Sequence, residues 1–279
     1  MNRKTNDLIV FSFIASVLIS LFSCYEHEEG CRDINALNYN VKADEDCENN
    51  CCSYPETEIQ MYMTNGSETI DTNKYFPLNN GDSVRVRYLR IFFSDFSFTG
   101  EDGTKIPVYK DILIGKRLNN SVEYEVQNFP VLKFKPESAF YNIGVCKILA
   151  RANQLSFSYG IKEEINNSVL DKLNSSSALY NGADSLYVDE KKGFYFLKML
   201  LQSKKHPATN KSIKASYENG LRQLKIYSVF DLTRRQKHTV KLNIDILKLL
   251  KGINMEEDES AARTKVIENL SSSVSLRSD

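Results

Sequence analysis

Residues 82–98, DSVRVRYLRIFFSDFSF, constrain the fold more than any other stretch of the chain. The stretch begins with strict alternation, in which Val84 and Val86 are separated and followed by arginine or tyrosine. From Leu89 onward it becomes apolar at neighbouring positions, which is typical of a strand covered on both faces. These residues therefore predict a central strand in a β domain.

Further strands are predicted by short alternating or apolar runs between well-marked turns. Asn219-Gly220 lies between two such runs and predicts a hairpin. Many short strands with turn residues between them indicate a sandwich or a barrel. The predicted strands lie at residues 57–63, 131–135, 138–150, 193–202, 212–218, 221–230 and 238–244.

Two helices are expected near the C-terminus. Residues 245–251, DILKLLK, follow a predicted strand and stop at a glycine, and residues 256–270 carry acidic side chains in their first turns, as the helix dipole favours. Residues 161–192 are polar and rich in Asn and Ser, and we expect a long excursion at the edge or end of the sheet. The predicted fold class is mainly β: a β-sandwich-like single domain with one or two C-terminal helices and a short disulfide-rich N-terminal segment.

The N-terminus has the form of an export signal. Arg3 and Lys4 precede residues 8–22, LIVFSFIASVLISLF, an uncharged run of fifteen residues. This run is short for a bilayer span, which needs about 20 apolar residues, but it suits the apolar part of a signal peptide. A buried core helix is the alternative, which the terminal position and the preceding basic residues disfavour. The expected signal peptide spans residues 1–23.

The segment Leu21-Phe22-Ser23-Cys24 resembles the lipobox of bacterial lipoproteins. The resemblance implies that Cys24 becomes the first residue of the mature protein and carries acyl chains. Several chains anchor a protein stably because each buried CH₂ contributes about 0.8 kcal/mol. The three glutamates that follow within five residues form either a solvated linker or a signal for export to the cell surface. We expect an outer-membrane lipoprotein that faces the periplasm or is exposed at the cell surface.

Four further cysteines are expected to form disulfides, because an exported chain meets an oxidising compartment. They are Cys31, Cys47, Cys51 and Cys52. Four cysteines allow three pairings. A bridge between the adjacent Cys51 and Cys52 would be strained, so each of the two is expected to pair with Cys31 or Cys47. Zinc is the rival interpretation, but the sequence lacks a regular paired C-x₂-C spacing.

The same segment contains GCRDINALNYNVKADEDC at residues 30–47, which resembles a short motif of bacterial surface proteins. Its Asp and Asn oxygens could suit a hard cation such as Ca²⁺. Asx residues more often make turns, and the spacing is not that of an EF-hand loop. Residues 24–56 are interpreted as a tether rich in Cys, Asp and Asn. Turn formation is the favoured role of its Asp and Asn residues, and calcium binding is the alternative. The sixth cysteine, Cys146, lies in the apolar stretch YNIGVCKIL and is expected to be a buried free thiol.

Charge and histidine content argue against two classes of function. Lys plus Arg and Asp plus Glu both total 36, so the chain has no electrostatic attraction for nucleic acid. The chain has three scattered histidines, His27, His206 and His238, and none of its Ser or Cys residues lies in a nucleophile-elbow setting. We therefore expect no nucleic-acid binding and no enzymatic activity.

Four stretches together resemble the MbnP-like family, named for a periplasmic protein of methanobactin gene clusters. They are KYFPLNNGDSVRVRYLRIFFSDFSF, FYNIGV, DSLYVDEKKGFYFLKMLLQS and HTVKLNIDILKLLKG. The resemblance covers residues 57–271 and implies an exported, often lipid-anchored all-β domain. It also implies a role in copper handling beside a di-haem peroxidase-like partner, through oxidation of a tryptophan.

The chain departs from this family at residues that would carry the chemistry. The family has a Met-Tyr-Trp-type stretch before the Gly-Tyr-x-Phe strand, whereas this chain has Leu186-Tyr187-Val188 and contains no Trp. Tryptophan-derived chemistry is therefore excluded. Cys146 follows Ile-Gly-Val where relatives tend to have an acidic residue. Met61 and Met63 place two thioethers on one strand face, which suits Cu(I) but more often reflects core packing.

The sequence thus predicts a lipid-anchored envelope or cell-surface binding or partner protein. An MbnP-like β domain is expected over residues 57–254, followed by a C-terminal helix and tail over residues 255–279. Copper or calcium is the candidate cofactor. The expected partners are the membrane, through Cys24, and a di-haem peroxidase-like protein or an outer-membrane receptor. A surface hydrolase using paired carboxylates and an adhesin or scaffold lipoprotein are the alternatives.

Overall fold

The computed structural model describes residues 27–47, 51–66, 68–78, 81–119, 121–137, 139–173, 175–180, 186–189 and 192–277. It divides between Ser53 and Tyr54 into a small N-terminal unit and a β domain. The expected signal peptide and Cys24 lie outside the described residues. Within the described part of the chain, no helix combines the length and the apolar character that a membrane crossing requires.

Two disulfides stabilise the N-terminal unit. Cys31 is bonded to Cys52, and Cys47 is bonded to Cys51. The structure therefore confirms disulfide bonding of all four cysteines, and it chooses one of the pairings that the sequence left open. The two adjacent cysteines each bond to an earlier one, which avoids the strain of a bridge between neighbours.

Asp and Asn side chains shape the turns of the N-terminal unit. Its two short strands, β1 (Glu29–Gly30) and β2 (Glu45–Asp46), pair in parallel. The Oδ1 atom of Asp33 accepts a hydrogen bond at 2.8 Å from the backbone N–H two residues later. The Oδ1 atom of Asn38 accepts the backbone N–H of Ser53, also at 2.8 Å. These oxygens thus satisfy backbone donors, as Asx residues in turns commonly do.

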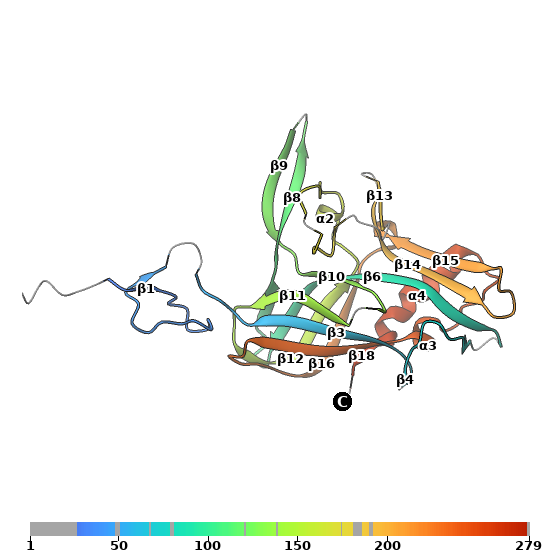
Figure 1. Cartoon of the computed structure of the whole chain (residues 1–279), viewed down its shortest axis with the longest axis horizontal. Coiled ribbons are helices and arrows are strands. Elements are labelled where there is room, and N and C mark those ends of the chain that lie inside the picture. Colours follow the sequence, from blue (N-terminus) through green and yellow to red (C-terminus); the bar gives the residue numbers. More distant parts are fainter. Residues whose placement is uncertain are drawn as a thin grey trace, which may run out of the picture. The chain divides into compact units, whose positions relative to one another are not determined.

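A 14-stranded sheet forms the β domain (Figure 1). One half of it has the strand order β7-β11-β3-β17-β18, and the other half is built around β6, which pairs with β14 and β12. The mainly β class is therefore confirmed. The strands are β3 (Glu56–Asn65), β4 (Glu68–Thr69), β5 (Phe76–Pro77), β6 (Ser83–Gly100), β7 (Lys105–Tyr109), β10 (Val131–Phe134), β11 (Phe140–Cys146), β12 (Ala150–Tyr159), β13 (Tyr187–Asp189), β14 (Gly193–Ser203), β15 (Asn210–Ser216), β16 (Arg222–Leu232), β17 (Lys237–Asp245) and β18 (Val274–Leu276).

Strand β6 is the long central strand that the sequence predicts. Val84 and Val86 are buried on one face, in line with the alternating start of the strand. From Leu89 to Ser94 every residue is buried, because side chains on both faces of the strand are covered here. The consecutive apolar residues of this stretch therefore follow from its central position.

Strands β3 and β17 bring the two ends of the domain sequence together. They pair in parallel from Glu56 opposite Lys237 to Thr64 opposite Asp245. The buried side chains of both strands join a single apolar core that also contains the buried residues of β6 and β14. The two strands that pair here are thus separated in sequence by most of the residues of the domain.

Two C-terminal helices cover part of this core, as predicted. They are α3 (Ile246–Leu249) and α4 (Glu259–Ser273). The carboxylate of Asp245 caps α3, and that of Asp258 caps α4 by accepting the backbone N–H of Ala261 at 2.9 Å. Capping satisfies amide groups that have no partner within the helix. The buried face of α4 consists of Ala262, Val266, Ile267, Leu270 and Ser273.

The hairpin predicted at Asn219-Gly220 is wrong. Strand β15 pairs with β14, whereas β16 pairs with β12, so the two runs on either side of Gly220 do not pair with each other. Between them the chain forms a 3₁₀ turn, η1 (Tyr217–Asn219), and Oδ1 of Asn219 accepts the backbone N–H of Ser216 at 2.9 Å. The asparagine side chain caps this turn, and the chain continues to a different strand partner.

A projecting hairpin was not predicted from the sequence. It consists of β8 (Asp111–Leu118) and β9 (Ser121–Asn128), which form a separate two-stranded sheet and extend away from the domain (Figure 1). An isolated bridge joins Gly115 of β8 to Val169, near the short helix α2 (Glu163–Asn166). The polar excursion expected after β12 therefore contacts this hairpin.

Candidate functional site

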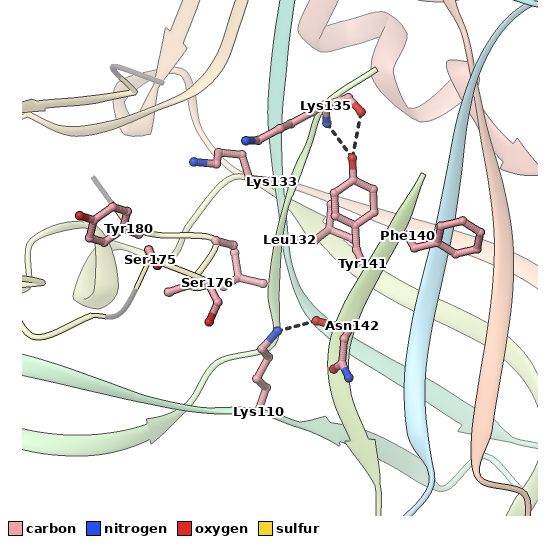
Figure 2. A pocket seen from close by; sticks show the side chains of 13 residues that line it. Lys110, Leu132, Lys133, Lys135, Phe140, Tyr141, Asn142, Ser175, Ser176 and Tyr180 are labelled. Carbon is pink, nitrogen blue, oxygen red and sulfur yellow. Dashed lines mark hydrogen bonds between the residues drawn. The ribbon is translucent and has the colours of Figure 1, made fainter. Parts of the chain in front are cut away.

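A cleft of about 640 Å³ lies beside β10 and β11 (Figure 2). Its volume falls in the range of roughly 300–1,000 Å³ that is usual for ligand sites. We call it the lysine cleft because Lys110, Lys133 and Lys135 line it, and among its described lining residues there is no Asp or Glu. The other lining residues are Val131, Leu132, Phe140, Tyr141, Asn142, Ser175, Ser176, Ser177, Ala178 and Tyr180.

Lys133 of β10 and Lys135, which directly follows the end of this strand at Phe134, both line the cleft. Leu132 and Phe134, at the intervening positions, are buried in the apolar core. Because side chains two residues apart share a strand face, the two lysines leave the backbone about 7 Å apart on one side. Figure 2 shows their side chains extending in the same direction.

Tyr141 of β11 holds the backbone of Lys135. Its hydroxyl accepts the Lys135 N–H at 2.8 Å and donates to the Lys135 carbonyl oxygen at 2.9 Å (Figure 2). Burial raises the pKa of the Tyr141 hydroxyl, so this group keeps the proton that the second bond requires. The ring also lies against Phe134, with the two centroids 6.4 Å apart. Tyr141 therefore fixes one end of the lysine pair.

Lys110 enters the cleft from the connection between β7 and β8. Its Nζ atom donates a hydrogen bond to the backbone carbonyl of Asn142 (Figure 2). Its backbone N–H donates to Oδ1 of Asn128 at 2.7 Å. Burial lowers the pKa of the Lys110 amine, because partial removal from water disfavours the charged form. This amine is therefore held in place at the cleft by a neutral acceptor.

A bulge in β11 lies directly beside Lys110. The pairing of β11 with β3 shifts register between Asn142 and Gly144, and Oδ1 of Asn142 accepts the Gly144 N–H at 2.9 Å. Gly144 has a φ of 124°, and a Cβ atom at this position would lie 2.2 Å from the carbonyl oxygen of Tyr109. Only glycine allows this close approach of the two chain segments.

The aromatic residues of the cleft are not equivalent. The ring of Phe140 is 62% exposed and points away from the three lysines (Figure 2). Tyr180 lies on the lysine side, near Ser175 and Ser176 (Figure 2). The lysine side of the cleft thus combines ammonium groups with hydroxyl groups, which together can bind negatively charged or polar ligands.

A second cavity, of about 530 Å³, contains an internal ion pair. Arg90 of β6 is 8% exposed and donates two hydrogen bonds to the carboxylate of Glu137. It also donates to the carbonyl of Leu89 and lies over the ring of Tyr88. Glu137 and the Leu89 carbonyl thus compensate the arginine charge within this cavity.

The two methionines considered as metal ligands lie in the apolar core. Met61 is 2% exposed and Met63 is 4% exposed. Their register partners on β17 are Leu242 and Ile244, which are both buried. The structure therefore gives the two thioethers a packing role and does not place them in the lysine cleft.

Cys146 is a buried free thiol, as predicted. Its sulfur lies 3.3 Å from Oγ1 of Thr57 on the neighbouring strand. Burial raises the pKa of the thiol to about 11, and the contact with Thr57 opposes this increase. The thiol is therefore protonated at neutral pH, where the thiolate is the reactive form.

The histidines occupy different environments, and none of them lines the lysine cleft. His27 belongs to the N-terminal unit, and His206 is exposed between β14 and β15. His238 is 6% exposed and lies opposite Thr57 in the register of β17 and β3. Burial lowers the pKa of His238, and the positive charge of Arg235 lowers it further.

Comparison with known proteins agrees with the strand pattern. The MbnP family model matches residues 55–267. The solved structure of MbnP from Methylosinus trichosporium is similar, with a TM-score of 0.45 and 10% identity; the alignment covers 76% of this chain and 87% of that one. No curated protein sequence matches the chain. Because the family model covers well over half of the chain, the chain belongs to the MbnP family.

Proposed function

We propose that this chain is a lipid-anchored, non-enzymatic binding protein of the bacterial envelope whose ligand occupies the lysine cleft. The cleft is the observation that carries this proposal. Tyr141 holds the backbone of Lys135, and the Asn142 carbonyl holds the amine of Lys110. Groups that are already ordered lose less conformational entropy when a ligand binds, which favours binding at such a site.

Export and lipid anchoring are supported by two features of the N-terminal region. The segment Leu21-Phe22-Ser23-Cys24 follows an uncharged run and resembles a lipobox. The unit that follows contains two disulfides, which persist in an oxidising compartment. We place the protein at the outer membrane, on either the periplasmic or the cell-surface side.

A binding role is favoured over a hydrolase by two observations: the Cys146 thiol is protonated, and the described lining of the lysine cleft contains no carboxylate pair. The Cys146 thiol is buried and has a raised pKa, so it is a poor nucleophile at neutral pH. A carboxylate hydrolase needs two acidic groups at a working separation across its cleft. The described lining of the lysine cleft instead provides lysines, serines and two tyrosines.

A role in copper handling rests on family membership. The described residues do not fit a Cu(I) site in the oxidised fold, because the clustered sulfur atoms of Cys47, Cys51 and Cys52 are in disulfides. Met61 and Met63 are enclosed by apolar neighbours. For calcium, several Asp and Asn oxygens of the N-terminal unit already accept backbone N–H groups. We therefore propose binding of a non-metal ligand, with an outer-membrane receptor or a di-haem peroxidase-like protein as the candidate partner.

Anchoring is tested by replacing the cysteine that would carry the lipid. We expect Cys24→Ala to abolish incorporation of a labelled fatty acid and to release the protein from the membrane fraction or leave it unprocessed. Cys146→Ala, which removes a buried thiol instead, should keep both properties. Fatty-acid labelling that persists in Cys24→Ala, or its absence from the wild-type protein, would contradict the anchor.

A further inference from the structure

We propose that the ligand of the lysine cleft is a polyvalent oxyanion: a small molecule that carries at least two carboxylate, phosphate or sulfate groups. This inference rests on the proposed binding function and specifies the chemistry of the ligand. It is argued from the position of the three amines, the neutral partner of the Lys110 amine and the size of the cleft.

Lys110 provides the first argument. Its amine is partly removed from water and donates to a neutral carbonyl, that of Asn142. A carbonyl dipole compensates a lost hydration shell less completely than a negative charge does. A bound oxyanion next to Lys110 would therefore stabilise the charged amine that the folded chain has already partly desolvated.

Lys133 and Lys135 provide the second argument. Lys133 lies on β10 and Lys135 directly follows its last residue, about 7 Å away along an extended chain, whereas Lys110 belongs to a different part of the sequence. Three amines from two directions match separated negative groups better than one compact ion. Lysine ammonium groups bind phosphate and carboxylate as point charges, so the proposal does not distinguish among oxyanion types.

Charge and volume provide the third argument. The whole chain is formally neutral, so general electrostatic attraction of anions is weak and a local cluster of lysines can be selective. The cleft volume of about 640 Å³ equals that of roughly 20 water molecules at 30 Å³ each, more than one inorganic anion fills. The serine hydroxyls at residues 175–177 add hydrogen-bond donors along the same cleft.

Calorimetric titration of the full-length protein in detergent tests the proposal. Citrate and tripolyphosphate serve as polyvalent probes, and acetate serves as the monovalent control. We expect one site per chain for at least one polyvalent probe, affinity that falls with added salt, and at least tenfold weaker binding of acetate. The double variant Lys133→Gln/Lys135→Gln and the single variant Lys110→Gln should each reduce affinity at least tenfold.

A matched control separates the cleft from surface lysines in general. Lys205→Gln/Lys225→Gln removes two exposed lysines that do not line the cleft and should stay within twofold of the wild type. Tyr141→Phe keeps the ring but loses both bonds to the Lys135 backbone, and should weaken binding without removing any charge. Circular dichroism verifies that each variant is folded.

Two results would overturn the proposal: no binding of either polyvalent probe, or equal losses in the cleft variants and the Lys205/Lys225 control. Neither result affects the membrane anchor, which fatty-acid labelling of Cys24 measures independently. Conversely, polyanion binding by a chain that is not acylated would retain the ligand class and contradict the proposed envelope anchor.

Discussion

His238 illustrates how burial sets the protonation state of a single side chain. It is almost fully buried on β17, and its Nε2 atom has no hydrogen-bond partner among the described residues. Burial and then the charge of Arg235 lower its pKa. In the unfolded chain the imidazole returns to an ordinary pKa of about 6.5. The neutral form is therefore favoured by folding.

This difference predicts acid sensitivity. Between about pH 6.5 and the lower pKa of the folded state, His238 is protonated in the unfolded chain but neutral in the folded chain. The free energy of unfolding therefore falls as the pH decreases through this range. Urea unfolding at about pH 7.5 and about pH 5 should show a smaller loss in His238→Gln than in the wild type. His206→Gln, at an exposed position, should match the wild type. Equal losses in all three proteins would contradict the prediction.

The environments of some individual residues could be predicted from the sequence, whereas those of others could not. The burial of Cys146 could be predicted because its neighbours in YNIGVCKIL are apolar. The shared face of Lys133 and Lys135 also follows from the alternation in VLKFK. The hydrogen bond from Lys110 to Asn142 joins residues 32 positions apart and depends on a bulge, which leaves no local pattern.

At the scale of elements, the β11 bulge positions one wall of the cleft and depends on Gly144. We expect Gly144→Ala to lower the free energy of unfolding by about 2–4 kcal/mol, because the added Cβ would collide with the Tyr109 carbonyl at a strained φ. Gly103→Ala is the control: its φ is also positive, at 85°, but no heavy atom lies within 4 Å of its Cβ position. It should cost about 1 kcal/mol. Urea unfolding would measure both, and similar values would argue against a steric role for Gly144.

The strands themselves were largely predictable, whereas their pairing was not. Alternation and apolar runs locate β3, β6, β14 and β17 because side-chain burial repeats every second residue. Asn219-Gly220 is a hairpin signal only when the flanking strands pair, and here each has a different partner. The β8–β9 hairpin was missed because its exposed positions, such as Val126 at 65%, weaken the alternation.

At the scale of the whole molecule, covalent and apolar stabilisation are divided between the two units. Both described disulfides lie in the N-terminal unit, while the apolar core of the β domain is formed by its own residues. Sites without shared partners contribute nearly independently to stability. The sequence indicated this division through the clustering of cysteines, but not the parallel pairing of β3 with β17, which joins distant segments.

We therefore expect reduction with dithiothreitol to change the free energy of unfolding of the β domain by less than about 0.5 kcal/mol. Far-ultraviolet circular dichroism during urea unfolding is a suitable measurement, since the chain has no Trp for fluorescence. Cys146→Ala provides a positive control, because removing a buried sulfur from the core should lower stability by about 1 kcal/mol. A large decrease on reduction of the wild type would show that the disulfides also support the domain.

If Cys24 carries the lipid anchor, as we propose, the Cys31–Cys52 disulfide has a mechanical consequence. It links residues 21 positions apart, with their Cα atoms 5.0 Å from each other. Fully extended, those residues would span roughly 70 Å at 3.3–3.6 Å each. While the disulfide is intact, residues 31–52 cannot extend under tension. The extensible segment is then mainly the seven residue-to-residue steps from Cys24 to Cys31, which span roughly 25 Å when fully extended. A load applied to the domain would thus reach the lipid without unravelling the N-terminal unit, and the distance the domain can travel from the membrane would be correspondingly short.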